Sequence, residues 1–486
     1  MVAVRGLVVG LLAAGLSGCF AFGPAGPKTV DTGPVVPADA PKTTGVETPD
    51  RTEQMKLIAQ FGGEYKAPAL ARYLDGVLAK LAPASDVPSE AYHVTLLNSP
   101  IVNAFALPSG DLFATRGLLA LANDTSEVAA VMAHEIAHVT ARHAAARAEL
   151  EKNSALIGKV AQVIQSPDKG QEVEARGRLS IAGFSRQQEL EADQIGVRVV
   201  GRAGYDPYGA SRFLASLGRS ASLRASLLGQ KTGDERPDLM STHPTTPERI
   251  TRAIAVARQI GAPGVGDTGR DEYLSAIDGM DFGDDPADGL VKGRRFIHPK
   301  LGFTFTAPEG FALDNSAQAV LGVASGGAEA LRLDSVRVPA STTLESYLGS
   351  GWIDGLQTKS IETISVNGLP AATATARGGE WTFRVAVVRL GTDVYRLIFA
   401  TRNLTEATDR KFRAAIDTFR RLGSDEAAEV KPLHISVVKA EAGDSVDSLS
   451  ARMAVSDRQV DMFLLLNGLE KGAVVEPGRR YKLVVE

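Results

Sequence analysis

Cysteine is almost absent from this 486-residue chain, which contains only Cys19. Intrachain disulfides are therefore excluded, and so is a cysteine nucleophile deep within a fold. A net charge of -4, with no Lys/Arg cluster to offset it, argues against a nucleic-acid-binding surface. No segment after the N-terminus has 18 consecutive apolar residues, so we expect no later segment to span a bilayer.

The N-terminus has the features of a secretion signal. Arg5 supplies positive charge, and residues 6–16 form an apolar run shorter than the ~20 residues of a spanning helix. Leu16-Ser17-Gly18-Cys19 resembles a bacterial lipobox, in which cleavage leaves the cysteine N-terminal and acylated. We therefore predict a signal peptide at residues 1–18, lipidation of Cys19 and a disordered tether at residues 19–50. The alternatives are an uncleaved anchor and an ordinary signal peptide.

The strongest chemical signal is His134-Glu135-Ile136-Ala137-His138. Two histidines four residues apart share one face of an α-helix, so both imidazoles reach a single ion. The glutamate beside the first histidine is placed to hold a water at that ion, which makes the pattern a zinc site with a general base. Residues 126–133 favour a helix, and Ser126 is its expected cap. The alternative is a buried helix with two hydrogen-bonded histidines.

A catalytic zinc site needs a third protein ligand, and residues 184–193 contain candidates. Glu189 and Asp193 are four residues apart and share a helix face, whereas Glu191 points elsewhere. We predict that Glu189 is the third ligand and that Asp193 holds the far nitrogen of a ligating histidine. The alternative is a solvated acidic helix face.

Extended segments precede the histidine motif. Residues 92–98 alternate as a strand does, and residues 102–115 are predicted to form a strand, a Pro-Ser-Gly-Asp turn and a second strand. An edge strand beside a metal helix is where an extended peptide would pair. We therefore predict substrate binding along one run, Asn103, Ala104, Phe105 and Ala106. A hairpin that only packs against the helix is the alternative.

Residues 103–110, 134–143 and 185–193, in this order, resemble the HtpX and CAAX-prenyl-protease-like family of gluzincin metallopeptidases. Membrane enzymes of that family surround the site with spanning helices, so this chain is more similar to the soluble periplasmic branch, which acts in envelope protein quality control and outer-membrane assembly. The resemblance implies that each chain binds one Zn2+ through His134, His138 and Glu189. It also implies that Glu135 is the general base.

Residues 240–250 also resemble the soluble branch. His243 is expected either to donate to the oxyanion or to occupy the open zinc position and hold the enzyme latent. Arg249 is expected to stabilise the oxyanion; the alternatives are a turn histidine and a surface arginine. His143 is half a turn out of phase with His134, and we expect it to be structural. Residues 149–178 are predicted to form a lid or a surface helix.

Two more domains are predicted beyond a linker at residues 263–294. Residues 295–423, with several strands and a closing helix at residues 409–421, resemble PsbP/Mog-like α+β domains. Trp352 and Trp381 are expected in the core of this domain. Its expected role is to bind a partner or to act as a spacer. Residues 431–486 resemble a LysM module (strand, two helices, strand). Such a module binds peptidoglycan glycans, here with Tyr481 in the groove, or else binds protein.

The predicted fold is thus α+β and multidomain, with a mainly helical zincin metalloprotease domain and its small edge-strand sheet at residues 51–262. We expect a zinc endopeptidase of the bacterial periplasm, lipid-anchored at the outer membrane, that cleaves misfolded or stalled envelope proteins and has no nucleic-acid partner. One alternative is an envelope chaperone or assembly scaffold with a latched or silent metal site. The other is a cell-wall hydrolase.

Overall fold

The computed structural model describes residues 51–88, 91–146, 185–228, 243, 246–316, 319–455 and 458–486. The predicted signal peptide, Cys19, the tether and the segment predicted as a lid at residues 149–178 lie outside this set. Contacts divide the chain into Met1–Gly33 and Pro34–Glu486, and all described residues belong to the second unit. Among them, no helix combines the length and apolar character needed to cross a membrane.

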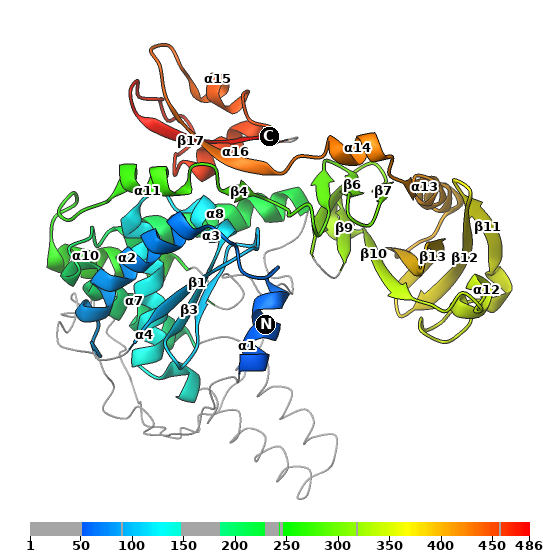
Figure 1. The fold of residues 1–486 in the computed structure, drawn as a ribbon, viewed down its shortest axis with the longest axis horizontal. Helices are drawn as coiled ribbons and strands as arrows, with labels where there is room; N and C mark the ends of the chain where they lie inside the picture. Colours follow the sequence, from blue (N-terminus) through cyan, green and yellow to red (C-terminus); the bar gives the residue numbers. More distant parts are fainter. Residues whose placement is uncertain are drawn as a thin grey trace, which may run out of the picture. The chain divides into compact units, whose positions relative to one another are not determined.

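Helices form most of the segment predicted as a metalloprotease (Figure 1). The central helix is α4 (Thr125–Thr140), which carries the histidine motif and packs against α7 (Arg186–Arg202) and α8 (Gly209–Leu228). Among the described residues of this segment, the other helices are α1 (Arg51–Gln60), α2 (Pro68–Ala84), α3 (Arg116–Leu121) and α10 (Pro247–Ile260). All residues of α4 except Val139 are buried, so the motif lies within the hydrophobic core.

The cap of α4 is Asp124, not the predicted Ser126. The Asp124 carboxylate accepts a hydrogen bond from the backbone N–H of Glu127 at 2.9 Å, and Ser126 donates its own hydroxyl to Asp124 at 2.6 Å. Arg212 of α8 also pairs with Asp124 at 3.0 Å. Aspartate and serine cap equally well, so the local sequence alone did not separate these two residues.

A three-stranded sheet lies against this helical core, in the order β1-β3-β2. Its strands are β1 (His93–Leu97), β2 (Ala104–Ala106) and β3 (Asp111–Thr115), which confirms the predicted strand, turn and strand. β1 pairs with β3 in parallel, and β2 pairs with β3 antiparallel. In the described part of the chain β2 is an edge strand, and it contacts α4.

The predicted linker contains a helix, α11 (Arg270–Ile277). Tyr273, Leu274 and Ile277 are fully buried in the same core as α4. They lie at positions i, i+1 and i+4, one face of a helix, but the glycines and aspartates around them indicated a hinge. Two short strands follow, β4 (Asp281–Phe282) and β5 (Leu290–Lys292).

Antiparallel strands dominate residues 295–423. A seven-stranded sheet has the order β11-β12-β13-β14-β10-β9-β8, and a four-stranded sheet has the order β15-β7-β6-β5. Their bounds are β6 (Arg295–His298), β7 (Phe303–Thr306), β8 (Phe311–Asn315), β9 (Val320–Ala324), β10 (Glu329–Arg337), β11 (Glu362–Val366), β12 (Leu369–Gly378), β13 (Trp381–Leu390), β14 (Asp393–Thr401) and β15 (Arg420–Arg421). Two 3-10 turns are η1 (Ser325–Gly327) and η2 (Thr358–Ser360).

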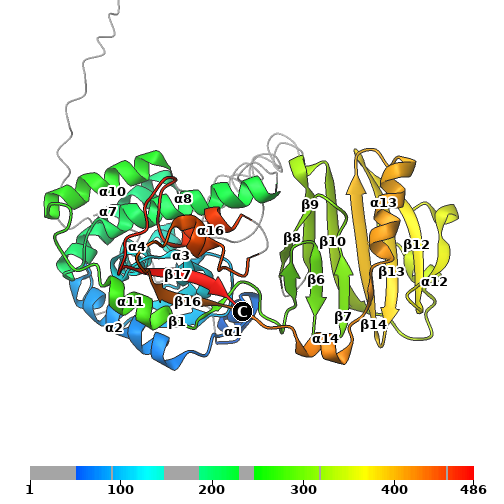
Figure 2. The same ribbon diagram turned by 90° about the horizontal axis from the view of Figure 1, so that it is seen from above.

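A helix packs against each face of the seven-stranded sheet, and Figure 2 shows the one that lies across its front. Alternate residues of a strand point to opposite faces. Ala371, Val388 and Phe399 therefore share a cluster with α13 (Glu406–Ile416), whereas Ala372 and Val385 share one with α12 (Leu344–Leu348). The closing helix begins three residues earlier than predicted because the side chain of Thr405 caps it. Trp352 is half-buried and packs against the core cluster beside α12, as expected, whereas Trp381 is half-buried and is not part of that cluster.

The C-terminal module is the predicted strand, two helices and strand: β16 (Leu433–Lys439), α15 (Val446–Ser450), α16 (Gln459–Leu466) and β17 (Arg480–Val485), after a short helix α14 (Ser424–Ala428). Tyr481 is only 1% exposed, and its hydroxyl accepts a hydrogen bond from Glu476 N–H at 3.0 Å. Its ring therefore offers no surface on which a sugar could stack, contrary to the expected groove.

The module and the segment predicted as a metalloprotease share one core. β16 pairs with β4 as well as with β17. Lys482 is fully buried and donates hydrogen bonds to the carbonyl oxygens of Ala120 at 2.8 Å and Ala122 at 2.5 Å. These carbonyls lie at the end of α3, just before α4, so the module is built against the residues that lead into the histidine helix.

Candidate metal centre

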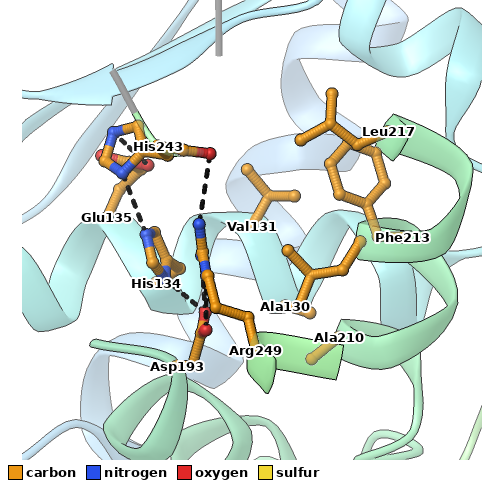
Figure 3. Close-up of a pocket in the computed structure, with 11 residues that line it drawn as sticks. Ala130, Val131, His134, Glu135, Asp193, Ala210, Phe213, Leu217, His243 and Arg249 are labelled. Carbon is orange, nitrogen blue, oxygen red and sulfur yellow. Dashed lines mark hydrogen bonds and ion pairs between the residues drawn. The ribbon is translucent and has the colours of Figure 1, made fainter. Parts of the chain in front are cut away.

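Four buried side chains meet at one point in the metalloprotease segment: His134, His138, Glu189 and His243. One donor atom from each lies within 4.8 Å of the others. His138 Nε2 is 3.0 Å from His134 Nε2. His243 Nδ1 is 2.8 Å from Glu189 Oε1 and 3.2 Å from His134 Nε2, and Figure 3 shows His243 beside His134. The structure thus brings the three predicted ligands together and adds His243 to them.

Two local features place these ligands. A capping box between Ser185 and Gln188 starts α7 and puts Glu189 in its first turn. Gly196 lets α7 approach α4 closely, because a Cβ atom there would lie 3.1 Å from the backbone nitrogen of His134. The two histidines of α4 and the glutamate of α7 therefore face each other across a close helix crossing.

The far nitrogens of both α4 histidines are occupied. His134 Nδ1 is 3.0 Å from Asp193 Oδ1, the contact that the four-residue spacing of Glu189 and Asp193 predicted. His138 Nδ1 is 2.9 Å from His143 Nδ1. Both Nε2 atoms are therefore directed to the common point, as in zinc sites where an outer partner fixes each ligand ring. Imidazoles with one carboxylate form a donor set that zinc favours, so these residues fit the ion.

The electrostatic field at this point favours a cation. Burial alone would lower the pKa of His134, but hydrogen bonds and charge from Asp193 and Glu189 outweigh it and raise that pKa to about 10. Burial would raise the pKa of Glu189, yet His134 and His243 hold it below its usual value. For His138, burial and then the neighbouring His134 lower the pKa. Positive charge is thus stabilised between the carboxylates, where a divalent ion would meet the same field.

Glu135, the predicted general base, is 3% exposed and lies 3.9 Å from His243 Nε2. Burial raises the pKa of its carboxyl, followed by smaller effects of the surrounding charges. A raised pKa brings a carboxylate closer to the pH at which it must accept and return a proton, which suits a general base.

Arg249 lies in the site, but its guanidinium already has several partners. Nε and Nη2 donate to Asp193 at 2.7 and 2.8 Å, Nη1 is 2.8 Å from Glu189, and Nη1 also donates to the His243 carbonyl at 3.2 Å. These contacts fix the positions of a ligand, of the partner of a ligand, and of the backbone that carries His243. The geometry therefore favours a positioning role over the predicted contact with the oxyanion.

His143 and Glu191 were not predicted to belong to the site. Arg142 has a positive φ of 55°, which ends the helical path after α4 and turns His143 back onto His138. The half-turn phase difference does not apply, because the helix ends at Thr140. His143 Nε2 lies 3.5 Å from Glu191 Oε2. If Nε2 of His138 binds a metal, the Nδ1–H of His138 donates a hydrogen bond to Nδ1 of His143. The Nε2–H of His143 then faces Glu191.

The predicted substrate strand divides into two kinds of residue. The Asn103 carbonyl accepts from Thr115 N–H at 3.1 Å, and Leu107 N–H donates to the Asp111 carbonyl at 2.9 Å. In an antiparallel pair, residues alternate between those that bond to the partner strand and those whose main-chain groups face away. Phe105, like Asn103, therefore directs its main-chain groups to strand β3. The main-chain groups of Ala104 and Ala106 face the open edge of the sheet.

Comparison with known proteins supports the chemistry of this site. Residues 68–257 match the model of peptidase family M48. The matched segment contains all four residues of the metal-ligand cluster. The expected resemblance to a metallopeptidase family is thus supported at the level of peptidase family M48.

Two curated relatives show how far the similarity extends. The beta-barrel assembly-enhancing protease of Escherichia coli (strain K12) is 31% identical over 219 residues, which are 43% of this chain and 43% of that protein. The mitochondrial metalloendopeptidase OMA1 of Arabidopsis thaliana is 34% identical over 203 residues, 40% of this chain and 38% of that protein. The chain thus spans less than half the length of these relatives.

Solved structures also resemble part of the chain, and that of a cyanobacterial protein is one example. The solution structure of cyanobacterial PsbP from Synechocystis sp. PCC 6803 matches at 15% identity with a TM-score of 0.21, covering 29% of this chain and 98% of that chain. A score this low supports no conclusion about the α+β domain.

Proposed function

We propose that this protein is a zinc-dependent endopeptidase that cleaves misfolded or stalled proteins of the bacterial envelope. The observation that carries the proposal is the buried cluster of four metal-ligand side chains with Glu135 beside it. The relative named as a beta-barrel assembly-enhancing protease supports an envelope role. A zinc ion held by His134, His138 and Glu189 would supply a Lewis acid and activate a water for attack on a carbonyl.

The protein's own groups carry the proton and orient the substrate. Glu135 accepts a proton as attack begins and returns it to the leaving amine, with the raised pKa of its carboxyl favouring the return. Asp193 and His143 hold the two ligand imidazoles in place. The main-chain groups of Ala104 and Ala106 pair with an extended substrate strand, and this fixes the scissile bond beside α4.

His243 supports a second candidate state, in which the site is latched. Its Nδ1 lies among the other donor atoms, close enough to Glu189 and His134 to occupy a fourth ligand position. A catalytic zinc keeps one position open, so a fourth protein ligand would hold the enzyme inactive. In this state the protein would act as an envelope chaperone or scaffold until His243 leaves. In the active state the same side chain would donate to the oxyanion.

The cellular setting is proposed from the ends of the chain. Lipidation at Cys19 would anchor the protein in the periplasm at the outer membrane, and the C-terminal module would contact peptidoglycan. Because the ring of Tyr481 is buried, any glycan contact must use other groups of the module. These features would place the protease where envelope proteins are assembled.

The deciding test measures zinc content and casein cleavage for the full chain in detergent. We expect about one zinc per chain and a loss of cleavage of about 10²–10⁴-fold in Glu135→Gln, the range that general acid–base catalysis contributes. Glu272→Gln, on the exposed side of α11, is the matched control and should cleave normally.

His243→Ala separates the two roles of that residue. Faster cleavage by the variant would establish the latch, whereas slower cleavage with normal zinc content would establish the oxyanion role. A chain that binds no zinc, or that stays inactive both as wild type and as His243→Ala, would refute the protease and leave a binding protein.

A further inference from the structure

The chain that joins α3 to α4 is held by an unusual number of side chains. α3 ends at Leu121, and α4 begins at Thr125. The last carbonyl groups of an α-helix have no partner within the helix, so a buried junction here needs other donors. Five successive carbonyl groups of the junction accept hydrogen bonds from side chains, namely those of Leu119, Ala120, Leu121, Ala122 and Asn123.

Most of these donors come from beyond the segment that matches the peptidase family, residues 68–257. In α11, the Tyr273 hydroxyl donates to the first of the five carbonyls, and Arg270 donates to the last at 2.8 Å. Lys482 of β17 donates to the second and the fourth, at 2.8 and 2.5 Å. Asn123 donates to the third at 3.2 Å and is the one local donor among the four. The start of the histidine helix is therefore held mainly by α11 and by the C-terminal module.

Lys482 is fully buried, a position that an ammonium group occupies only when partners offset its lost hydration. The two carbonyl oxygens are such partners. Burial lowers the pKa of Lys482, and the negative charge of Glu127, in the first turn of α4, acts against that shift. Both kinds of partner belong to the junction and to α4, so Lys482 is a docking contact rather than a solvated strand residue.

The module fits this junction closely around Lys482. The Asn467 side chain fixes the main chain of Lys482, accepting from its N–H at 2.7 Å and donating to its carbonyl at 2.9 Å. The next residue, Gly468, lies against Asn123, because a Cβ atom there would be 2.9 Å from the Asn123 amide nitrogen. Arg270 also donates to the Arg480 carbonyl at 3.0 Å, which ties α11 to the same strand.

The position of the junction determines the position of the metal ligands. The Asn123 N–H donates to the Glu127 carboxylate at 2.9 Å, so the junction is bonded to the first turn of α4. His134 follows Thr125 by nine residues on the same helix, about 14 Å along its axis. A shift of the helix start along this axis therefore moves the α4 histidines past Glu189 of α7. Functional sites of this kind tolerate only about 0.5 Å of such displacement.

We propose that α11 and the C-terminal module position the histidine helix, with Lys482 as a positioning residue for the metal centre. The inference rests on the proposed zinc endopeptidase and gives the module a role inside the protease itself. The working unit of the enzyme thus extends beyond residues 68–257 to include α11 and β17.

Lys482→Met in the full chain tests the inference. The variant keeps a long side chain but leaves two buried carbonyl groups without their donor. We expect zinc affinity, measured by competition with a chelator, to fall about 10-fold, roughly the effect of one lost hydrogen bond to a charged group. We also expect a changed absorption spectrum of the cobalt form and faster amide hydrogen exchange in the first turns of α4.

Three further variants separate positioning from general stability. Tyr273→Phe removes one hydroxyl donor, should change the same readouts by a smaller factor, and replaces Lys482→Met if that variant does not fold. Leu449→Ala, in the buried core of α15, removes no donor to the junction; it should lower the unfolding midpoint and keep the zinc affinity and cobalt spectrum. Lys471→Met changes an exposed lysine of the same module and should match the wild type.

Two results would overturn the inference. One is folded Lys482→Met and Tyr273→Phe variants with wild-type zinc affinity, cobalt spectrum and hydrogen exchange of α4. The other is a Leu449→Ala variant that changes these readouts as much as Lys482→Met does at an equal loss of stability. A wild-type chain that binds no zinc would instead overturn the endopeptidase, and hydrogen exchange of α4 would still test the positioning contact because it requires no metal.

Discussion

Buried charge is arranged differently in the metalloprotease segment and in the α+β domain. In the α+β domain, buried charged groups form compact pairs: Asp334 with Arg396 at 2.6 Å, and Arg384 with Asp409 at 2.6 Å. In the metalloprotease segment, three histidines direct nitrogen atoms to one point beside a glutamate. The first arrangement balances itself, whereas the second is a set of donor atoms that a cation would fit.

This difference indicates where buried charged groups lose free energy of hydration in order to build a functional site. A buried charge is tolerated when a partner offsets its lost hydration, and pairs such as Asp334 and Arg396 meet that condition by themselves. Asp193 and Arg249 form the same kind of bidentate pair at the metal centre, but their remaining contacts lead to His134, Glu189 and the His243 backbone. A common ion-pair motif is thus used there to position ligands.

The largest effect expected outside the metal centre comes from Phe412→Ala in the α+β domain. Phe412 is fully buried and its ring stacks on Phe399 at 4.9 Å between centroids. Removing a buried phenylalanine ring typically costs about 3–5 kcal/mol. We expect that loss in the unfolding transition of this domain, measured by urea denaturation, with zinc content and casein cleavage unchanged. Loss of zinc together with the domain would show that the two regions do not fold separately.

A smaller effect is expected from His143→Ala within the metal centre. His143 lies between His138 and Glu191, and removing such an outer partner typically weakens metal binding by about 10–100-fold. Competition with a zinc chelator measures the affinity, and the absorption spectrum of the cobalt form reports the ligand geometry. Glu191→Gln should act in the same direction, and its effect should disappear in the His143→Ala background.

His93→Ala is the control for that measurement, because His93 is exposed in the same segment. His143→Gln should restore part of the affinity, since its carbonyl can accept from His138 Nδ1–H. A zinc affinity unchanged in both His143 variants would reduce His143 to a packing residue and remove the proposed contact chain.

The sequence alone predicted the parts of the site that depend on helical periodicity. His134, His138, Glu189 and Asp193 are pairs with four-residue spacing, and the structure brings all four together. The place of His143 in the site was not predicted, because a positive φ at Arg142 changes the chain direction and no periodic pattern indicates such a change. A pocket beside the metal centre, lined by Val131 of α4 and by Phe213 and Leu217 of α8, was not predicted. The two helices lie far apart in the sequence, and only packing shows that they meet.

The fold was predicted to a similar extent. Strands β1, β2 and β3 follow from alternation and a turn, and the module follows from its strand and helix order. The sequence did not predict α11 or the contact of Lys482 with the α3 carbonyls. A lysine in an alternating strand normally indicates a solvated face, and only a tertiary contact explains its complete burial.

The smallest expected effect concerns His298, a buried histidine outside the metal centre. Burial, with a smaller contribution from Lys300, lowers its pKa to about 4, and Nδ1 accepts a hydrogen bond from Leu301 N–H at 3.3 Å. The unfolded state, with a pKa near ~6.5, binds more protons between about pH 6.5 and 4, so acidification destabilises the α+β domain. Partial contact with solvent limits this loss to about 1 kcal/mol.

His298→Asn should remove that part of the acid sensitivity, because the amide oxygen accepts the same hydrogen bond at every pH. The test compares urea midpoints of the domain at pH 7, 5.5 and 4.5 for the variant and the wild type. A constant difference between the two proteins across this range would contradict the argument. Divergence on acidification would show that the buried His298 stays neutral through packing alone. His134 differs, because Asp193 and Glu189 raise its pKa and so stabilise positive charge.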